Sequence, residues 1–432
     1  MHRLPLAGLN SRHLVAKSLR VCLDPGKKLP YNWRDKLLNV TLSVCLARSV
    51  ILQDIARIQG GLVKTAEERL SRFLSRTRLH LTPSHEAAAA RALRRLGKRR
   101  LWRHHGKAVL ITDSTSYAKK RSRGRLRPMP RTGRVRLHNL QSSETVLAPG
   151  YQELCVGVLL KDRTFFPLTR RLFTENAPWF TSQNSLEHYE IRRAVDLLRR
   201  TLKLDVLVVA DRGFGRMELF DWLLQQPGTD FLVRLNGRLR VEAGGFKGLL
   251  DKLATHWPER LRMFWREGKR PIHSAVAARP VRVSRAGGAL LEFNVLCLTP
   301  VRQAVEPMLL ATSLPASTCT DLAALVRIYS SRWAVETFFF SFKESFRAGG
   351  FRVFSSWEAI DRLLAIAHIA FLALRLLFLV SQTKPWLARS FACQARRWFA
   401  GRTGLSFGRF LRLIQADSAF LSLRTRPFPA PV

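Results

Sequence analysis

The sequence contains few acidic residues for its size. Its 31 Asp and Glu stand against 73 Lys and Arg, which gives the 432-residue chain a net charge of +42 and an isoelectric point near 11.5. An organism-wide excess of Arg, or a heavily solvated surface, explains a moderate basic excess more easily than one of this size. The balance therefore predicts a polyanionic partner, above all nucleic acid.

The sequence also lacks any cysteine arrangement typical of a disulfide or zinc scaffold. Six cysteines are scattered without a CxxC pair or a Cys/His quartet: Cys22, Cys45, Cys155, Cys297, Cys319 and Cys393. This pattern indicates a reducing compartment and argues against a structural zinc ion. The first residues lack the apolar stretch of a signal peptide, so we expect a cytoplasmic protein.

An uncharged apolar run long enough to cross a membrane is missing as well. Residues 363–380 come close, but they contain His368 and Arg375. A membrane span needs about 20 apolar residues and rarely carries a central charge. We therefore expect a buried core helix here and no membrane partner.

Helix-capping and glycine signals dominate the first part of the chain, residues 1–106, which we interpret as a basic, helical, DNA-binding region. An amphipathic helix is predicted over 34–59, ending at Gly60-Gly61. A capping box at 65–68 opens the next helix, and Ser84 caps an Ala-rich helix that continues into the basic stretch 91–105.

The next part, residues 107–235, has the pattern β-β-β-α-β-α-β. The predicted strands are 108–113, 151–160, 164–173, 204–211 and 230–235, and the predicted helices are 185–202 and 216–225. Residues 236–318 then alternate in hydrophobicity and predict a β-rich insertion. A long helix capped at Thr320-Asp321 occupies 319–354, and a helical region follows over 355–432, ending in a Pro-rich tail at 427–431.

Asp113 and Asp211 each close an apolar strand, where a carboxylate needs a reason. Taken alone, either one is more often a turn or helix cap. If the two strands are neighbours in one sheet, however, both carboxylates reach a common point, and Glu336 on the following helix could complete a cage for two Mg²⁺ ions. Three crowded anions of this kind require a neutralising cation.

Glu336 belongs to a run that, if helical, carries four functional side chains on one face. At 100° per residue, the second, third and fourth of them lie about 60°, 20° and 40° to one side of the first. They are Tyr329, Arg332, Glu336 and Lys343. Two cations, a phenol and a carboxylate suit a phosphodiester held beside a divalent metal.

These residues resemble a known family. Asp113, then Asp211 in Val-Val-Ala-Asp-Arg-Gly-Phe, then an insertion and Tyr329-x2-Arg332-x3-Glu336-x6-Lys343 are similar to bacterial insertion-sequence transposases with an Asp-Asp-Glu (DDE) site. More narrowly, they resemble insertion-sequence family four, whose signature is Tyr-x2-Arg-x3-Glu-x6-Lys. The resemblance extends from about residue 108 to 354.

The resemblance implies a ribonuclease-H-like mixed-sheet core interrupted by the β-rich insertion. It implies that Asp113, Asp211 and Glu336 hold two Mg²⁺ ions, for which Mn²⁺ can substitute. It further implies that Tyr329, Arg332 and Lys343 contact the transposon-end backbone and steady a flipped base. Members commonly nick one strand, form a hairpin, reopen it and join the ends to target DNA, acting as dimers in a synaptic complex with nucleoid DNA.

One position departs from the pattern. Better-known members have a Trp in the last insertion strand, where this chain has Met308, so the flipping aid and the hairpin route are less well supported than the carboxylates. Arg212 and Arg234 are predicted either to reach a phosphate or to be surface cations. The basic stretch 119–136 either orders on DNA or stays solvated.

Two rivals to a transposase remain at this point. One is a metal-dependent nuclease on the same core, which cuts without strand transfer and has no need of the Tyr, Arg and Lys stripe. The other is an inactive DNA-binding relic of a mobile element, against which the three intact carboxylates argue. The phenylalanines around Glu336, namely Phe338, Phe339, Phe340 and Phe342, are expected to pack in the core.

Overall fold

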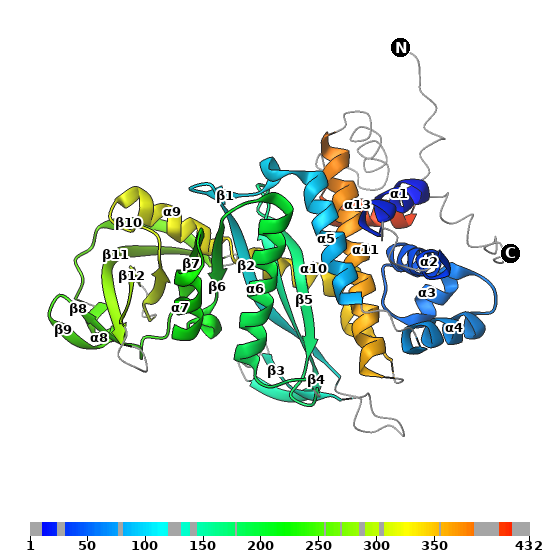
Figure 1. Ribbon diagram of the computed structural model, residues 1–432, viewed down its shortest axis with the longest axis horizontal. Helices are drawn as coiled ribbons and strands as arrows, with labels where there is room; N and C mark the ends of the chain where they lie inside the picture. Colours follow the sequence, from blue (N-terminus) through cyan, green and yellow to red (C-terminus); the bar gives the residue numbers. More distant parts are fainter. Residues whose placement is uncertain are drawn as a thin grey trace, which may run out of the picture.

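A computed structural model of the chain shows a mixed α/β protein built on one large sheet (Figure 1). It describes residues 11–23, 31–76, 81–119, 131–138, 145–177, 179–254, 256–267, 270–284, 290–301, 306–353, 356–383 and 406–416. Cys393, the Pro-rich tail and most of the basic stretch 119–136 lie outside these residues. The mixed sheet with helices agrees with the predicted fold class.

Five strands at the centre of the sheet follow the predicted order of elements. They are β2 (Lys107–Ala118), β4 (Thr145–Leu159), β5 (Phe165–Phe173), β6 (Val206–Ala210) and β7 (Thr229–Arg234), with α6 (Gln183–Leu202) before β6 and α7 (Met217–Gln225) after it. Their order across the sheet is β5-β4-β2-β6-β7. The first three pair antiparallel, whereas β2, β6 and β7 run parallel. The predicted elements β-β-β-α-β-α-β are all present in this order, and the structure adds an unpredicted strand, β3 (Gly133–His138), between β2 and β4.

The strand β6 shows why this part of the sequence folds as it does. All five of its residues, Val-Leu-Val-Val-Ala, are buried. A β-branched run without polar residues suits a parallel strand covered on both faces. Because β6 lies between two parallel partners, its carboxyl end meets theirs at one edge of the sheet.

The predicted β-rich insertion extends this sheet. It contains β8 (Arg240–Ala243), β9 (Phe246–Leu249), α8 (Leu250–Ala254), β10 (Leu261–Glu267), β11 (Arg270–Ser284), β12 (Leu290–Pro300) and β13 (Met308–Thr312). The last of them, β13, pairs antiparallel with β7, so the sheet continues as β7-β13-β12-β11-β8-β9. Figure 1 shows these strands at one end of the molecule, beyond β6 and β7.

The helices at the opposite end surround α11 (Trp357–Thr383), drawn in orange in Figure 1. They are α1 (Ser11–Leu23), α2 (Tyr31–Ala47), α3 (Leu52–Gln59), α4 (Val63–Arg76), α5 (Leu81–Leu96) and α13 (Phe407–Ala416). Among the described residues, α11 is the single helix long and apolar enough to cross a membrane by itself, and 94% of its most apolar window is buried inside the protein. The prediction of a buried core helix is confirmed.

Several predicted helix boundaries were wrong. The predicted helix 34–59 is two helices, α2 and α3, which meet at 107°. The bend follows Arg48, whose φ of 47° is left-handed. Ser49 then fixes the turn, since its hydroxyl accepts from the Ile51 amide at 3.1 Å and donates to Asp54 at 2.7 Å.

Two predicted caps and one predicted extension were also wrong. Thr65 and Ser84 lie inside α4 and α5, which begin at Val63 and Leu81. The Ala-rich helix does not continue through 91–105, because Gly97 adopts φ 74° after Leu96. A short 3₁₀ helix, η3 (Lys98–Arg100), and the strand β1 (Arg103–His104) follow it. Within the stretch 119–136, residues from Gly133 belong to the strand β3 (Gly133–His138).

Candidate functional site

Asp113 and Asp211 are neighbours at the carboxyl edge of the parallel strands. Thr112 of β2 pairs with Ala210, the last residue of β6. Each aspartate is the next residue along its chain, so the two carboxylates leave adjacent strands at the same level. The condition under which both carboxylates reach a common point, neighbouring strands in one sheet, is therefore met.

The sequence pattern predicts that the first strand ends at Asp113, but in the structure the strand continues past it. Beyond the last pair with β6, β2 continues to Ala118 by pairing with β4, where Asp113 faces Cys155. The apolar pattern stops at Asp113 because the parallel partner stops there. The strand itself persists through the polar residues that follow.

The predicted functional helix is two helices joined by a tight turn. Tyr329 lies in α9 (Cys319–Ser330), and Arg332 is the N-cap of α10 (Trp333–Ser345), which carries Glu336 and Lys343. Backbone bonds of the tighter i→i+3 type run through the joint, including Arg332 N to Tyr329 O at 2.9 Å. The four side chains still reach one region, although the predicted single helix was wrong.

The N-cap of α9 was predicted two residues late, although the predicted first residue of the region, 319, is the first residue of the helix. Thr318 is the N-cap, and it forms a capping box with Asp321: the Thr318 hydroxyl accepts from the Asp321 amide while the Asp321 carboxylate accepts from the Thr318 amide. The predicted cap Thr320 lies within the helix. This box fixes the start of the helix that carries Tyr329 in its last turn.

Arg332 joins two of the three carboxylates. Its Nη1 donates to Asp113 Oδ2 at 2.9 Å and its Nη2 to Glu336 Oε1 at 2.8 Å, with only 10% of the Arg332 side chain exposed. The third carboxylate, Asp211, accepts from the Tyr329 hydroxyl at 3.3 Å. Arg332 also interacts with Tyr329 and Asp211, so the three carboxylates, Arg332 and Tyr329 form one connected cluster.

Lys343 of α10 contacts the part of β2 that follows Asp113. Its Nζ donates to the Thr115 hydroxyl at 2.6 Å and to the Ser116 carbonyl at 2.9 Å, and it lies over the ring of Tyr117. Burial lowers the pKa of Lys343 from its usual value. The lysine therefore anchors α10 to the part of β2 that extends past the two aspartates.

The pKa values of the cluster reflect buried negative charge. Burial raises the pKa of Asp113 to about 6, with Asp211 adding to the rise and Arg332 opposing it. Burial likewise raises the pKa of Glu336. Burial disfavours the cation of Arg332, but Asp113 and Asp211 outweigh this and hold the pKa of Arg332 above its usual range. Arg332 is thus the cation that offsets the negative charge of the three carboxylates, and without it they would lack a neutralising partner within the cluster.

This donor set fits a hard divalent cation in its chemistry. Three carboxylates offer only oxygen ligands, which Mg²⁺ and Mn²⁺ prefer. Burial is the main cause of the raised pKa of Asp113 and the charge of Asp211 adds to it, so a cation bound here would favour the charged carboxylates. The residues that could hold such ions are Asp113, Asp211 and Glu336.

The other residues singled out from the sequence, Arg234, Arg212 and Met308, differ in how they lie relative to the carboxylate cluster. Arg234, at the end of β7, is half-buried and its positive charge acts on Tyr329. Arg212 is exposed in the short turn η4 (Arg212–Phe214) that follows Asp211. Met308 is 5% exposed, and it pairs with Leu298 in the sheet.

Three of the four phenylalanines near Glu336 pack in the core, as predicted: Phe338, Phe339 and Phe342. Phe340 does not, because 68% of it is exposed. It lies on the same side of α10 as Glu336, four residues away.

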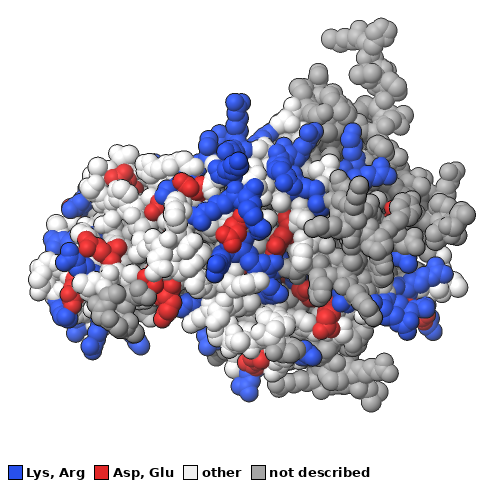
Figure 2. All heavy atoms as spheres, in the orientation of Figure 1, with Lys and Arg blue, Asp and Glu red and all other residues white. Residues whose placement is uncertain are grey.

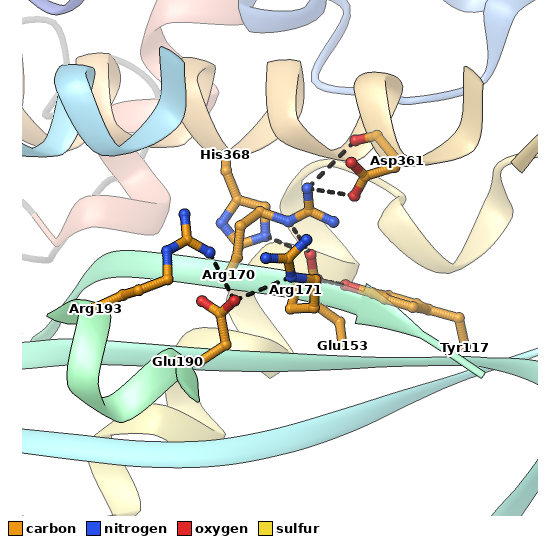
Figure 3. A network of polar contacts seen from close by, with 8 residues as sticks. All are labelled: Tyr117, Glu153, Arg170, Arg171, Glu190, Arg193, Asp361 and His368. Atoms are coloured by element: carbon orange, nitrogen blue, oxygen red, sulfur yellow. Dashed lines mark hydrogen bonds and ion pairs between the residues drawn. The ribbon is translucent and has the colours of Figure 1, made fainter. Parts of the chain in front are cut away.

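A buried ionic network behind the cluster was not foreseen from the sequence. Glu153 of β4 accepts from Arg170 Nε at 2.5 Å and from the Tyr117 hydroxyl at 2.5 Å, and His368 of α11 lies 3.2 Å away (Figure 3). Arg170 also pairs with Asp361 at 2.8 Å. The signal in the sequence was a Glu inside an apolar strand pattern, which needs a buried partner.

The same network contains the one group of possible metal ligands whose atoms all lie within 4.8 Å of one another in the described residues, namely Glu153, Cys155 and His368. Burial alone would raise the pKa of Glu153, but His368 and Arg170 lower it below its usual range. Arg170 already neutralises this carboxylate. The group is therefore explained by an ion pair, and the three candidate carboxylates are held further apart with Arg332 between them.

Basic side chains cover much of the surface seen in Figure 2. Lys and Arg gather over the middle of this face, around α5, α6 and β1, with Asp and Glu between them. The excess agrees with the net charge of +42. A surface of this kind attracts polyanions.

Comparisons with known proteins point in the same direction. Residues 187–372 match the family model described as the transposase DDE domain. The match supports a DDE transposase. It spans Asp211 and the segment from Tyr329 to Lys343, and it begins after Asp113.

Among solved structures, the chain is similar to the piggyBac transposase in its synaptic complex with hairpin DNA. The TM-score is 0.42 and the identity 13%, over 98% of this chain and 73% of that one. A comparison with curated proteins finds no match.

Proposed function

We propose that this chain is a DDE transposase that acts on the ends of an insertion sequence, with Asp113, Asp211 and Glu336 as its catalytic carboxylates. The observation that carries the proposal is their convergence with Arg332 across more than 200 residues of sequence. The strand order β5-β4-β2-β6-β7, with antiparallel and then parallel pairing, supports a ribonuclease-H-like core. The sequence signature supports insertion-sequence family four.

The carboxylates are the groups that would hold two divalent ions, Mg²⁺ or Mn²⁺. Such ions, when bound, activate an attacking water or 3′-hydroxyl and stabilise the leaving oxygen of a phosphodiester. The chain's own contribution is to fix three oxygen donors at one sheet edge. β2 and β6 position the aspartates, and the tight turn before α10 positions Glu336.

Arg332, Lys343 and Tyr329 are proposed to bind the DNA backbone at the cut. Guanidinium and ammonium groups recognise phosphate oxygens, the first in a bidentate fashion. Arg234 is near enough to Tyr329 to take part. Arg212, exposed beside Asp211, can reach a phosphate outside the cluster. Cut-and-paste transfer through a hairpin is the proposed route, although buried Met308 offers no aromatic face to a flipped base.

The stripe also favours a transposase over a plain metal-dependent nuclease. A nuclease needs only the carboxylates. The same sheet edge also carries Tyr329, Arg332 and Lys343, which can hold the DNA end that a transposase joins to its target. The relic hypothesis is disfavoured because all three carboxylates are present and clustered. We further propose that the protein works as a dimer on two element ends, in the cytoplasm where nucleoid DNA is accessible.

The test uses the full chain, Mg²⁺ and a duplex that carries the inverted repeats flanking the gene. Nicked, hairpin and strand-transfer products are separated on a denaturing gel, which distinguishes a transposase from a nuclease. Glu336→Gln and Asp211→Asn should abolish every product, while Asp196→Asn, on the exposed face of α6, should leave them unchanged. Full activity in either of the first two variants would refute the assignment.

A further inference from the structure

A second basic site lies at the far end of α10 from the candidate metal cluster. A pocket of 570 Å³ opens between the end of α2, the helix α3 and the end of α10. Three of its lining residues are arginines, Arg48, Arg57 and Arg347, and two are acidic, Asp54 and Glu344. None of these residues belongs to the cluster around Asp113.

Two of the three arginines have an unusual backbone. Arg48 has φ 47° after α2, and Arg347 has φ 50° after α10. These are the positions just past a helix end where glycine is the usual residue, because side chains are strained in the left-handed region. Strained residues of this kind gather at ligand-binding sites, where the side chain has a use that outweighs the strain.

The charges of the pocket are not balanced. Asp54 is shared, since it accepts from Arg57 at 3.0 Å and from Arg347 at 2.9 Å. Burial lowers the pKa of Arg48, and the positive charge of Arg412 lowers it further. Three arginines thus stand against two carboxylates, and two of the arginines share Asp54, so the pocket keeps a net positive charge that an added anion would balance.

The exposed face of α10 connects this pocket with the cluster. Exposed residues recur every three or four positions along the helix and beyond it: Trp333, Thr337, Phe340, Glu344 and Arg347. Glu336 adjoins this face, one residue before Thr337. A DNA strand that follows the exposed face of α10 from Glu336 would therefore pass exposed Phe340 and reach Arg347.

We propose that the pocket formed by Arg48, Arg57 and Arg347 holds a backbone phosphate of the DNA whose cleaved bond lies at Glu336. The inference rests on the proposed function, because it takes the polyanion to be DNA. Arg347 is eleven positions after Glu336 and two past the end of α10, which places it about 16 Å away along the helix axis. At about 3.4 Å per nucleotide, the phosphate belongs about five nucleotides from the cut.

Arg347→Gly is the decisive variant, because it removes the cation while relieving the left-handed strain. The protein should keep its melting temperature. Its affinity for a fluorescein-labelled 40-bp duplex of arbitrary sequence, measured by anisotropy without divalent metal, should fall about tenfold. The slope of log affinity against log salt should drop by about one, as expected for one lost phosphate contact.

Two further variants serve as controls. Lys203→Gly removes a cation from another left-handed position, the C-cap of α6, which precedes the start of β6 and so lies at the opposite end of that strand from Asp211. It should leave affinity and salt slope close to those of the wild type. Glu344→Gln removes a negative charge from the pocket and should strengthen binding.

The outcomes separate this proposal from the proposed function. Unchanged affinity and slope in Arg347→Gly, or an equal loss in Lys203→Gly, would overturn the pocket while leaving the DNA-binding cluster intact. A melting temperature that falls in Arg347→Gly together with unchanged affinity would assign Arg347 to the ion pair with Asp54 alone. Failure of the wild type to bind the duplex would refute the proposed function itself.

Discussion

Arg332 donates a hydrogen bond to Asp113 at 2.9 Å, across 219 residues of sequence. Its other terminal nitrogen bonds to Glu336 at 2.8 Å. The guanidinium therefore lies between two of the carboxylates proposed to hold metal, in the position of a counter-cation. A metal ion bound by both carboxylates would compete with Arg332 for their negative charge, and a DNA phosphate is a suitable alternative partner for the guanidinium.

We predict that Arg332→Ala binds Mn²⁺ several-fold more tightly than the wild type when DNA is absent, because the competing cation is gone. Added DNA should raise the Mn²⁺ affinity of the wild type and leave that of the variant nearly unchanged. Electron paramagnetic resonance of free Mn²⁺ measures both quantities. Weaker binding in the variant would mean that Arg332 positions the carboxylates and does not compete with the metal.

Lys343→Met should separate DNA binding from metal binding at the same site. The change keeps the apolar stem of Lys343 but removes the ammonium group that contacts Thr115 and the Ser116 carbonyl. Duplex affinity should fall about tenfold, with the Mn²⁺ affinity retained. Thr115→Val, which removes one acceptor and no charge, is the matched control. Equal loss of metal affinity in Lys343→Met would contradict this division of roles.

Metal binding should weaken in mild acid because Asp113 takes up a proton. Burial raises its pKa to about 6, so below that pH a metal ion must displace the proton. The sign for stability follows from the same shift. The metal-free native state binds this proton more tightly than the unfolded chain does, so the Asp113 contribution to stability is lost as pH rises from about 4 to about 6.

Isothermal titration with Mn²⁺ between about pH 5 and 7.5 tests the metal binding, and urea unfolding of the metal-free protein between about pH 4 and 7.5 tests the stability. Affinity should rise with pH and level off above about 6.5. In Asp113→Asn the corresponding part of the pH dependence of stability should disappear. A Mn²⁺ affinity independent of pH across this range would rule out protonation of Asp113.

The strands and the site residues were readable from the sequence for a physical reason. Buried parallel strands need continuous apolar runs, and a carboxylate after such a run stands out, as Asp211 does after β6. Asp113 was found for the same reason, although its strand continues. The apolar run in β2 continues only while β2 is paired with both β4 and β6. The run therefore marks where the pairing with β6 ends, and the strand itself continues beyond that point.

Helix ends were read less well, because their determinants are local geometry that several sequences can satisfy. The break after α2 depends on Arg48 in a left-handed conformation, a position for which glycine is the expected signal. The tight turn at Arg332 leaves the helical periodicity almost intact, so a single helix was the natural expectation. The network at Glu153 needed knowledge of which strands and helices meet.

That network yields the last prediction, which concerns stability. Glu153 and Arg170 are both fully buried, and the carboxylate also accepts from Tyr117. Glu153→Gln leaves the Arg170 cation facing a neutral amide, with only Asp361 left as an anionic partner, and it should destabilise the protein by about 3–5 kcal/mol.

The double change Glu153→Leu with Arg170→Met removes both charges together and should recover most of this loss, because apolar residues of similar size avoid the cost of burying ions. Urea unfolding of the wild type, the single variant and the double variant measures the difference. Since Asp113 faces Cys155, two residues from Glu153 on the same face of β4, a repacked network should also shift the Mn²⁺ affinity slightly. A double variant as unstable as the single one would show that Tyr117 and His368, which keep their polar groups, need the ion pair to be satisfied.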